Sequence, residues 1–385
     1  MYSKIKIAIL YQVIMHYRIP FYERIANDEK YDMTLFYGKG KKGTKLINND
    51  IFETRIKGKK LFSIRLPFIT NNRSGTMLLS PFLFFTLIFS SPQVIFSEGS
   101  SSLLNASIAF IYSKLFKKKF IWWSLGNLAT TNYAGIRKFI NKWEHVIEKK
   151  SDAIFTYSTQ GKNYFISRGI NEKKIFVAVN VIDTNRKLEE IEKYKNLKID
   201  FAFEKYFNLV FIGSITKEKN LELLIDTLDE FNKRNNKSGF LHIVGDGTYM
   251  TTIEKYIQNK GMIDNICLYG RINEGANKIL KYCDVMILPG LGGLAICEAM
   301  LNSLPVITGR ADGTEIDLVD NSNGFILAEM TVKSLLSKIE YLHNNSEERL
   351  NMGKSSYEKI TTIYNFNNYY DIFDKCVKFA INNES

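Results

Sequence analysis

The stretch Val285–Thr308 reads VMILPGLGGLAICEAMLNSLPVIT. Its two ends, VMILP and LPVIT, are short apolar runs that suit buried strands. Between them, GLGG provides a glycine-rich loop whose backbone can approach a ligand closely. A helix follows, with Glu298 in its first turns. A carboxylate there can accept hydrogen bonds from both hydroxyls of a ribose, or it can be an ordinary helix N-terminal carboxylate favoured by the helix dipole.

The same alternation of short apolar runs with helix-length amphipathic runs extends over nearly the whole chain. The predicted strands of the first half are KIKIAILY, YDMTLFY, QVIFS, KFIWW, AIFTYS and IFVAV, and those of the second half are NLVFIG, FLHIVG, NICLYG, VMILP and LPVIT. Continuous apolar strands separated by helices indicate parallel sheets covered on both faces. We therefore expect an α/β protein with two Rossmann-like, doubly wound domains that face each other across a cleft.

The length of 385 residues suits two domains. We place the first at residues 1–182 and the second at 205–360, because the polar stretch NRKLEEIEKYKNLKID between Val181 and Tyr206 reads as a linker. Residues 361–385 have apolar side chains at helical spacing and are expected to form a helix that packs back toward the first domain.

The net charge of +12 is concentrated in the first half. Residues 1–180 hold 28 Lys and Arg against 11 Asp and Glu, whereas residues 181–385 hold 24 against 29. The basic blocks Lys57–Lys60 and Lys117–Lys119 either face anionic lipid or form a solvated surface. They form no recognised nucleic-acid-binding module, so nucleic acid is not an expected partner. The uncharged stretch Ser74–Ser97 has a densely apolar part of only 13 residues, MLLSPFLFFTLIF, and is predicted to be a buried or membrane-grazing helix rather than a spanning one.

A second candidate site is FIGSITKEKNLELLIDTL, from Phe211 to Leu228. A strand ends at Gly213, a short loop follows, and a helix begins near Asn220. The free N–H groups of a helix N-terminus, with Lys219 at its mouth, make a receptor for a diphosphate. A plain surface loop gives the same pattern, so this segment is not decisive alone.

Six motifs in order over Leu209–Leu327 carry a family resemblance: FIGSITKEKN, HIVGDGTYM, LYGRI, CDVMILPG, GLGGLAICEAMLNSLPVIT and DNSNGFIL. They resemble the donor domain of glycosyltransferase family 4, of the GT-B fold. In the first half, MHYRIPFYERIA and DAIFTYSTQGKNYFISRGINEKKIFVAVNVID are similar, more loosely, to a subset that builds bacterial polysaccharides and lipid-linked glycans.

The resemblance implies a donor site that is assigned residue by residue. Lys219 matches the diphosphate-binding lysine, and Glu298 matches the glutamate that holds the ribose. Gly293 and Leu294 match the loop under the diphosphate, and Gly270 and Arg271 border the nucleotide base. Gly213 ends the strand before the diphosphate loop. Three positions depart from the family: Ser214 replaces an arginine, Gly290 replaces the first glutamate of a pair, and Leu125 replaces a histidine.

Candidate residues in the first half follow the ends of predicted strands. His16 and Arg18 come after the first strand, and Glu98 ends the strand QVIFS. A carboxylate at such a position can bind acceptor hydroxyls or act as a base. We therefore name Lys219, Glu98 and His16 as catalytic candidates, and Arg18 and Glu98 as acceptor-side candidates. As alternatives, Arg18 pairs with Glu23, and Glu98 caps the following helix.

The resemblance implies a retaining glycosyltransferase of the hexosyltransferase type. It would move a sugar from a UDP- or GDP-sugar to a hydroxyl of a glycan or glycolipid acceptor, at the cytoplasmic face of the membrane. No D-x-D motif occurs, the cysteines lack metal-ligand spacing, and no metal or other cofactor is expected. Two rivals remain open: a nucleotide-sugar-binding scaffold with weakened catalysis, and a nucleotide-sugar epimerase of the same fold.

Overall fold

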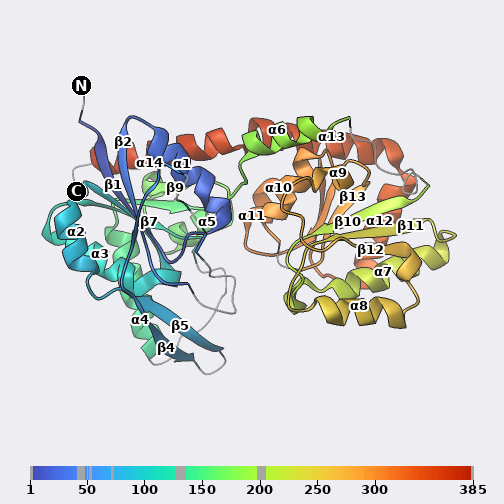
Figure 1. Cartoon of the computed structure of the whole chain (residues 1–385), viewed down its shortest axis with the longest axis horizontal. Coiled ribbons are helices and arrows are strands. Elements are labelled where there is room, and N and C mark those ends of the chain that lie inside the picture. The colour runs from blue at the N-terminus through green and yellow to red at the C-terminus, as the bar shows by residue number, and fades with distance from the viewer. Residues whose placement is uncertain are drawn as a thin grey trace. The chain divides into compact units, whose positions relative to one another are not determined.

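The computed structural model describes residues 3–40, 48–49, 51, 54–70, 73–126, 136–196, 205–290 and 292–382. The chain divides into two compact units, drawn in Figure 1. The first unit comprises Met1–Ala178 and Tyr369–Ser385, and the second comprises Val179–Asn368. Each unit is built on a parallel sheet with helices between its strands, so the predicted α/β class with two Rossmann-like domains is confirmed.

The sheet of the first unit has seven strands in the order β3-β2-β1-β6-β7-β8-β9, all parallel. The strands are β1 (Ile5–Tyr11), β2 (Tyr31–Tyr37), β3 (Lys57–Lys60), β6 (Val94–Glu98), β7 (Lys119–Trp123), β8 (Ala153–Thr156) and β9 (Ile175–Val177). The chain runs outward from β1 to β3 and then returns to place β6 on the other side of β1. The switch point of this sheet therefore lies between β1 and β6, where open α/β sheets bind ligands.

The helices of the first unit follow its strands, as a doubly wound sheet requires. They are α1 (Ile19–Asn27), α2 (Leu83–Ser90), α3 (Leu103–Leu115), α4 (Ile136–Lys150) and α5 (Thr159–Ser167), with 3-10 turns η1 (His16–Arg18), η2 (Ser100–Ser102) and η3 (Glu172–Lys174).

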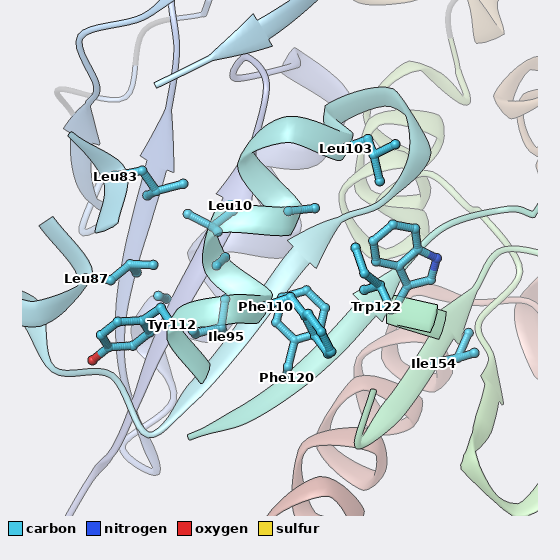
Figure 2. Packing of buried hydrophobic residues seen from close by; sticks show 14 of the residues in the cluster. Leu10, Leu83, Leu87, Ile95, Leu103, Phe110, Tyr112, Phe120, Trp122 and Ile154 are labelled. Carbon is cyan, nitrogen blue, oxygen red and sulfur yellow. The ribbon is translucent and has the colours of Figure 1, made fainter. Parts of the chain in front are cut away.

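One face of this sheet carries the hydrophobic cluster of Figure 2. Strand residues such as Ile95, Phe120 and Trp122 are buried there together with Leu87 of α2 and Phe110 of α3. Successive strand residues point to opposite faces, so their neighbours Phe96, Ile121 and Trp123 face the other way, and all are fully buried.

The opposite face is covered by α1 and by the C-terminal helix α14 (Phe366–Asn382). Phe373 of α14 makes edge-to-face ring contacts with Phe21 of α1 (5.2 Å), Phe96 of β6 (5.3 Å) and Tyr31 of β2 (5.8 Å between centroids). Tyr370 donates a hydrogen bond of 2.7 Å to Asp28. The last residues of the chain thus complete the core of the first unit.

The apolar stretch near residue 80 differs from its prediction. Arg73–Leu79 forms strand β5, which pairs with β4 (Ile64–Thr70) in an antiparallel hairpin, and only Leu83–Ser90 is helical. Pro81 disfavours helical backbone at the preceding residue, and the N–H of Ser80 is bonded instead to Asn105 Oδ1 at 2.8 Å. No described helix has the length and apolar character that a membrane crossing demands.

The sheet of the second unit has six parallel strands in the order β12-β11-β10-β13-β14-β15. They are β10 (Phe207–Ile212), β11 (Gly239–Val244), β12 (Ile266–Leu268), β13 (Val285–Leu288), β14 (Val306–Gly309) and β15 (Gly324–Leu327). Its switch point lies between β10 and β13. The helices and turns are α6 (Thr184–Tyr194), η5 (Lys217–Lys219), α7 (Leu221–Arg234), α8 (Met250–Asn259), η6 (Ile263–Asn265), α9 (Asn277–Leu280), α10 (Leu294–Leu301), α11 (Thr314–Leu318), α12 (Val332–Asn344) and α13 (Ser346–Thr362).

The stretch that was read as a linker begins with an ordered helix. Thr184–Tyr194 forms α6, which belongs to the second unit, and the boundary between the units falls at Ala178 and Val179. Asp183 caps the helix by accepting a hydrogen bond from the N–H of Arg186 at 3.1 Å. Residues 197–204 of the predicted linker lie outside the described residues.

The ring cluster around α14 predicts a large cost for truncating Phe373. Its side chain is fully buried among aromatic rings, so Phe373→Ala should lower the free energy of unfolding of the first unit by about 3–5 kcal/mol. Chemical denaturation followed by tryptophan fluorescence measures this change, because all three tryptophans lie in the first unit. Lys375→Ala, at an exposed position of the same helix, serves as the control. Equal stabilities of the two variants would contradict the role given to α14.

Candidate active site

The predicted donor-site loops meet at the switch point of the second sheet. Strands β10 and β13 are hydrogen-bonded neighbours, and both loops leave from their carboxyl ends. The loop after β10 carries Gly213, Ser214 and Lys219, and the loop after β13 carries Gly290 and Gly293. Segments about 70 residues apart in sequence are therefore brought together where a ligand of this fold would bind.

Backbone contacts join the turns after β10, β11 and β12. Gly213 N donates to Val244 O at 3.0 Å, and Gly245 N donates to Gly270 O at 2.8 Å. A β-carbon on Gly245 would lie 1.8 Å from Gly213 O, so no side chain fits there. Gly270 has a φ of +66° and open space around its α-carbon. The turn at Gly245 thus contacts both Gly213 and the predicted Gly270. The neighbouring Arg271 side chain is exposed.

Lys219 closes the 3-10 turn η5, and Asn220, with a φ of +52°, begins helix α7. A β-carbon on Gly213 would lie 3.9 Å from Lys219 Cε, so the lysine stem runs beside the end of β10. Lys219 is half-buried, whereas Lys217 is exposed. Of the two lysines, Lys219 is therefore the one whose side chain lies beside the end of β10.

Gly290 fits tightly against that turn. A β-carbon on Gly290 would lie 2.1 Å from Glu218 O and 2.7 Å from Lys219 Cα. Contacts of that length are not seen for real β-carbons, and both neighbours are backbone atoms that cannot rotate away. The glycine at this position, where relatives of the resembled family have a glutamate, is therefore required by the approach of the two loops.

Helix α10 places Glu298 in its second turn rather than at its N-terminus, because Gly293 is the N-cap and Leu294 is the first residue. Glu298 Oε1 forms an ion pair with Lys187 Nζ of α6 at 3.2 Å. Burial raises the pKa of Glu298, and the ammonium of Lys187 opposes that rise. The alternative of a carboxylate held by the helix dipole does not apply, since the favourable interaction decays within the first turn.

Sequence reasoning missed a second carboxylate in this region. A β-carbon on Gly293 would lie 3.5 Å from Asp312 Oδ2, so Asp312 stands beside the N-terminus of α10. Its Oδ1 accepts hydrogen bonds from Thr314 N at 3.1 Å and from the Thr314 hydroxyl. The following Glu315 is buried and accepts from Ala311 N and Gly313 N, each at 2.9 Å. The segment ADGTE, which none of the predicted motifs included, thus forms the start of helix α11 and the turn before it.

In the first unit, Glu98 spans the switch point between β1 and β6. Its Oε2 accepts a hydrogen bond from Gln12 N at 3.0 Å, and its Oε1 accepts one from the Ser101 hydroxyl. Burial raises the pKa of Glu98, while Ser101, Gln12 N and the charge of Arg18 lower it, and the net shift is upward. Through Ser101 the carboxylate contacts the turn η2 before α3, but no side-chain cap is formed at the start of η2 or of α3.

Arg18 is almost completely buried. Its Nη1 donates to Tyr369 OH of α14 at 2.9 Å. The guanidinium carbon lies 4.7 Å from the ring centroid of Trp123, 5.0 Å from that of Tyr157 and 5.3 Å from that of Tyr17. No ion pair with Glu23 is seen among the described residues. Arg18 is therefore held by rings and a tyrosine hydroxyl, and its burial favours a role in fixing α14.

His16 is exposed at the start of η1 and stands edge-on to the Tyr17 ring at 5.5 Å. Leu125 precedes Gly126, whose φ is +78°.

A further carboxylate, Glu144 of α4, accepts a hydrogen bond from the hydroxyl of Ser100, two residues beyond Glu98. No sequence pattern marks Glu144, because its place follows only from the packing of α4.

Metal binding was not expected, and no three His, Cys, Asp or Glu side chains group as ligands within the described ranges. The functional role of every residue named above stays a prediction.

The approach of the two loops predicts the effect of Gly290→Ala. The new methyl group must displace the backbone of Glu218 and Lys219, which should lower the free energy of unfolding by about 1–3 kcal/mol. Denaturant titration measures the change. Gly309→Ala is the control, because its methyl group would meet the flexible end of Met330 at 3.2 Å. A Gly290→Ala protein as stable as the control would show that the loops do not touch.

Comparison with known proteins finds a family match over part of the chain. Residues 192–359 match the model of the family described as glycosyl transferases group 1. An uncharacterized glycosyltransferase of Methanocaldococcus jannaschii is 27% identical over 220 residues, which cover 54% of this chain and 60% of that relative. A second uncharacterized glycosyltransferase of the same organism is 25% identical over 291 residues, covering 71% of this chain and 73% of the relative.

The solved structure of Anabaena HepE in complex with UDP has the same fold. Its TM-score is 0.75 at 13% sequence identity, and the superposition covers 98% of this chain and 100% of HepE. The predicted GT-B fold and the resemblance to family 4 are confirmed by these matches, whereas the bacterial polysaccharide subset stays a prediction. The chain thus has the GT-B fold, and its residues 192–359 are similar to glycosyl transferases group 1.

Proposed function

We propose that this chain is a glycosyltransferase, which moves a sugar from a UDP- or GDP-sugar to a hydroxyl of a lipid-linked surface glycan, with retention at the anomeric carbon. One observation carries the donor half of the proposal: Gly213, Lys219 and Gly290 meet at the switch point of the second sheet. Glycine turns without side chains, a lysine and the start of α7 together suit a diphosphate. HepE has been solved with UDP and with UDP-glucose, which supports trying uridine donors first.

In the proposed reaction, the bond between the anomeric carbon and the diphosphate oxygen breaks, and a bond to the acceptor oxygen forms. The hydroxyl proton of the acceptor passes to the departing diphosphate. Negative charge develops on the diphosphate as its bond breaks, so a cation beside it stabilises the transition state more than the bound substrate. Lys219 fills that role, and Ser214 adds no charge where the resembled family has an arginine.

The first unit offers groups suited to a sugar acceptor. Tyr11 ends β1 and Tyr157 follows β8, so their half-buried rings border the same edge of the sheet as Glu98. Trp123 is fully buried and packs against both, with its ring centroid 5.0 Å from that of Tyr11 and 5.9 Å from that of Tyr157. Aromatic faces suit the C–H side of a sugar ring, and the Glu98 carboxylate suits its hydroxyls. His16, exposed near this edge, is a weaker candidate for proton transfer.

Turnover of UDP- and GDP-sugars to the free nucleotide diphosphate tests the proposal. We expect one donor to be consumed, and Lys219→Ala to lower kcat by roughly 10²-fold, the effect of removing one oxyanion-stabilising donor. Lys217→Ala is the matched control, since Lys217 is exposed on the same turn, and it should change kcat much less. A larger defect in the control would move the diphosphate to the other lysine. Donor binding without turnover would favour the scaffold alternative.

A lipid-linked acceptor requires the first unit to approach a membrane, and its surface suits that role. Phe82, Phe85 and Phe89 of the α2 segment are 60%, 58% and 85% exposed. Phe62, also exposed, lies 6.0 Å from the Phe82 ring. The end of α3 adds exposed Leu115 and Phe116, followed directly by Lys117 and Lys118. Apolar side chains beside lysines fit the boundary of an anionic bilayer. Attraction to the anionic lipids of the cytoplasmic face contributes about 1 kcal/mol of binding free energy per lysine.

Vesicles that contain phosphatidylglycerol test this surface. The protein should bind at low salt and be largely released near 0.5 M salt, where charges are screened within a few ångströms. Replacing both Phe85 and Phe89 with serine should weaken binding at least about tenfold, since each buried ring is worth about 1.5–3 kcal/mol. Leu350→Ser, which changes a 71% exposed residue of the second unit, is the control. No binding by the unaltered protein would favour an ordinary solvated surface.

A further inference from the structure

Helix α6 begins the second unit and packs against α10 and α9. Its sequence, TNRKLEEIEKY, is polar apart from two apolar residues and would be stable alone only marginally. It is fixed at its start by the Asp183 cap and by a hydrogen bond of 3.0 Å from Phe366 N to the hydroxyl of buried Thr184. The side chains of its first two turns therefore have a defined position beside the donor site.

Lys187 of α6 is the centre of a network of ion pairs. Its Nζ lies 3.2 Å from Glu298 Oε1 and 3.0 Å from Glu190 Oε2, and the three side chains are only 14–24% exposed. Burial lowers the pKa of Lys187, but Glu298 and Glu190 outweigh burial, and the pKa is raised. The lysine thus stays charged and pairs with two carboxylates, of which only Glu190 belongs to its own helix.

Glu190 extends this network to the loop after β12. Its Oε1 accepts a hydrogen bond from Gly275 N, and Gly275, with a φ of +85°, precedes α9. That loop starts at Gly270 and Arg271, the predicted border of the nucleotide base. Lys278 of α9 lies 4.1 Å from the ring centroid of Tyr194, at the other end of α6. One helix therefore joins the predicted ribose contact to the predicted base contact.

We propose that Lys187 is a positioning residue for donor binding, which orients the Glu298 carboxylate toward the ribose hydroxyls while Glu190 ties the same lysine to the loop 270–276. The proposal rests on the proposed function. Lys187 occupies Oε1 of Glu298, and the described residues give Oε2 no bond, so that oxygen is available to a ligand. An ionised acceptor forms stronger hydrogen bonds than a neutral one. Without its lysine, Glu298 would be a largely buried acid with no counter-charge.

The test compares nucleotides with and without ribose hydroxyls. Calorimetry measures the Kd of UDP, GDP and their 2′,3′-dideoxy forms for the full chain and for Lys187→Met. We expect Lys187→Met to weaken UDP or GDP, whichever binds, by about tenfold, in line with one charge-assisted hydrogen bond. The dideoxy form should change by less than about twofold, since it has no hydroxyl for Glu298. Glu298→Gln should give the same pattern, and Lys187→Arg, which keeps the charge, should recover most of the affinity.

Lys193→Met makes the same substitution at an exposed position of α6 and should leave every Kd unchanged. Lys187→Gln repeats the comparison if the methionine variant is unstable. Unchanged UDP and GDP affinity in Lys187→Met would overturn the proposal. An equal loss with the dideoxy form would also overturn it, because the lysine would then act on the fold of the whole site. Failure of the unaltered chain to bind either nucleotide would instead overturn the proposed function, and that result is visible before any variant is made.

Discussion

The second unit depends on turns that meet backbone to backbone. A β-carbon would lie 1.8 Å from Gly213 O at Gly245, 2.1 Å from Ile215 O at Gly247 and 2.1 Å from Glu218 O at Gly290. Three glycines in two of these turns thus exclude side chains for the same steric reason. Their backbones line one edge of the sheet, and peptide groups fixed in this way need no reorganisation to meet a ligand. The position of Lys219 follows from this packing, because the turn that carries it has Gly290 against it.

The two switch points have opposite chemistry. In the second unit, glycine turns and Lys219 leave a region of peptide dipoles and positive charge that suits an anion. In the first unit, the equivalent edge holds the carboxylate of Glu98 and the half-buried rings of Tyr11 and Tyr157, groups that suit hydroxyls and apolar ring faces. The same arrangement of strands therefore carries different chemical groups at its two switch points, and the difference lies in a few residues at the strand ends.

The sequence predicted what depends on local pattern. Apolar runs marked the parallel strands, and glycine spacing marked the loops after β10 and β13, since both signals lie within a few residues. Contacts between distant segments gave no such signal. The pair of Lys187 with Glu298 joins residues far apart in the chain, and the bond of Arg18 to Tyr369 links its two ends. Ser80 and Pro81 were local signals that the apolar stretch is not one helix. Asp312 and Glu144 became visible only once loops and helices were placed.

The position of α14 has a consequence for how the protein is made. The first unit takes its last packing element from Tyr369 onward, whereas the second unit is complete at Asn368. During synthesis, the strands β1 to β9 emerge first, yet their Phe21, Phe96 and Phe155 rings stay uncovered until the final helix leaves the ribosome. The second unit can fold in that interval, since all its strands are already available. Of the two units, the one that comes first in the sequence is thus the later one to close its core.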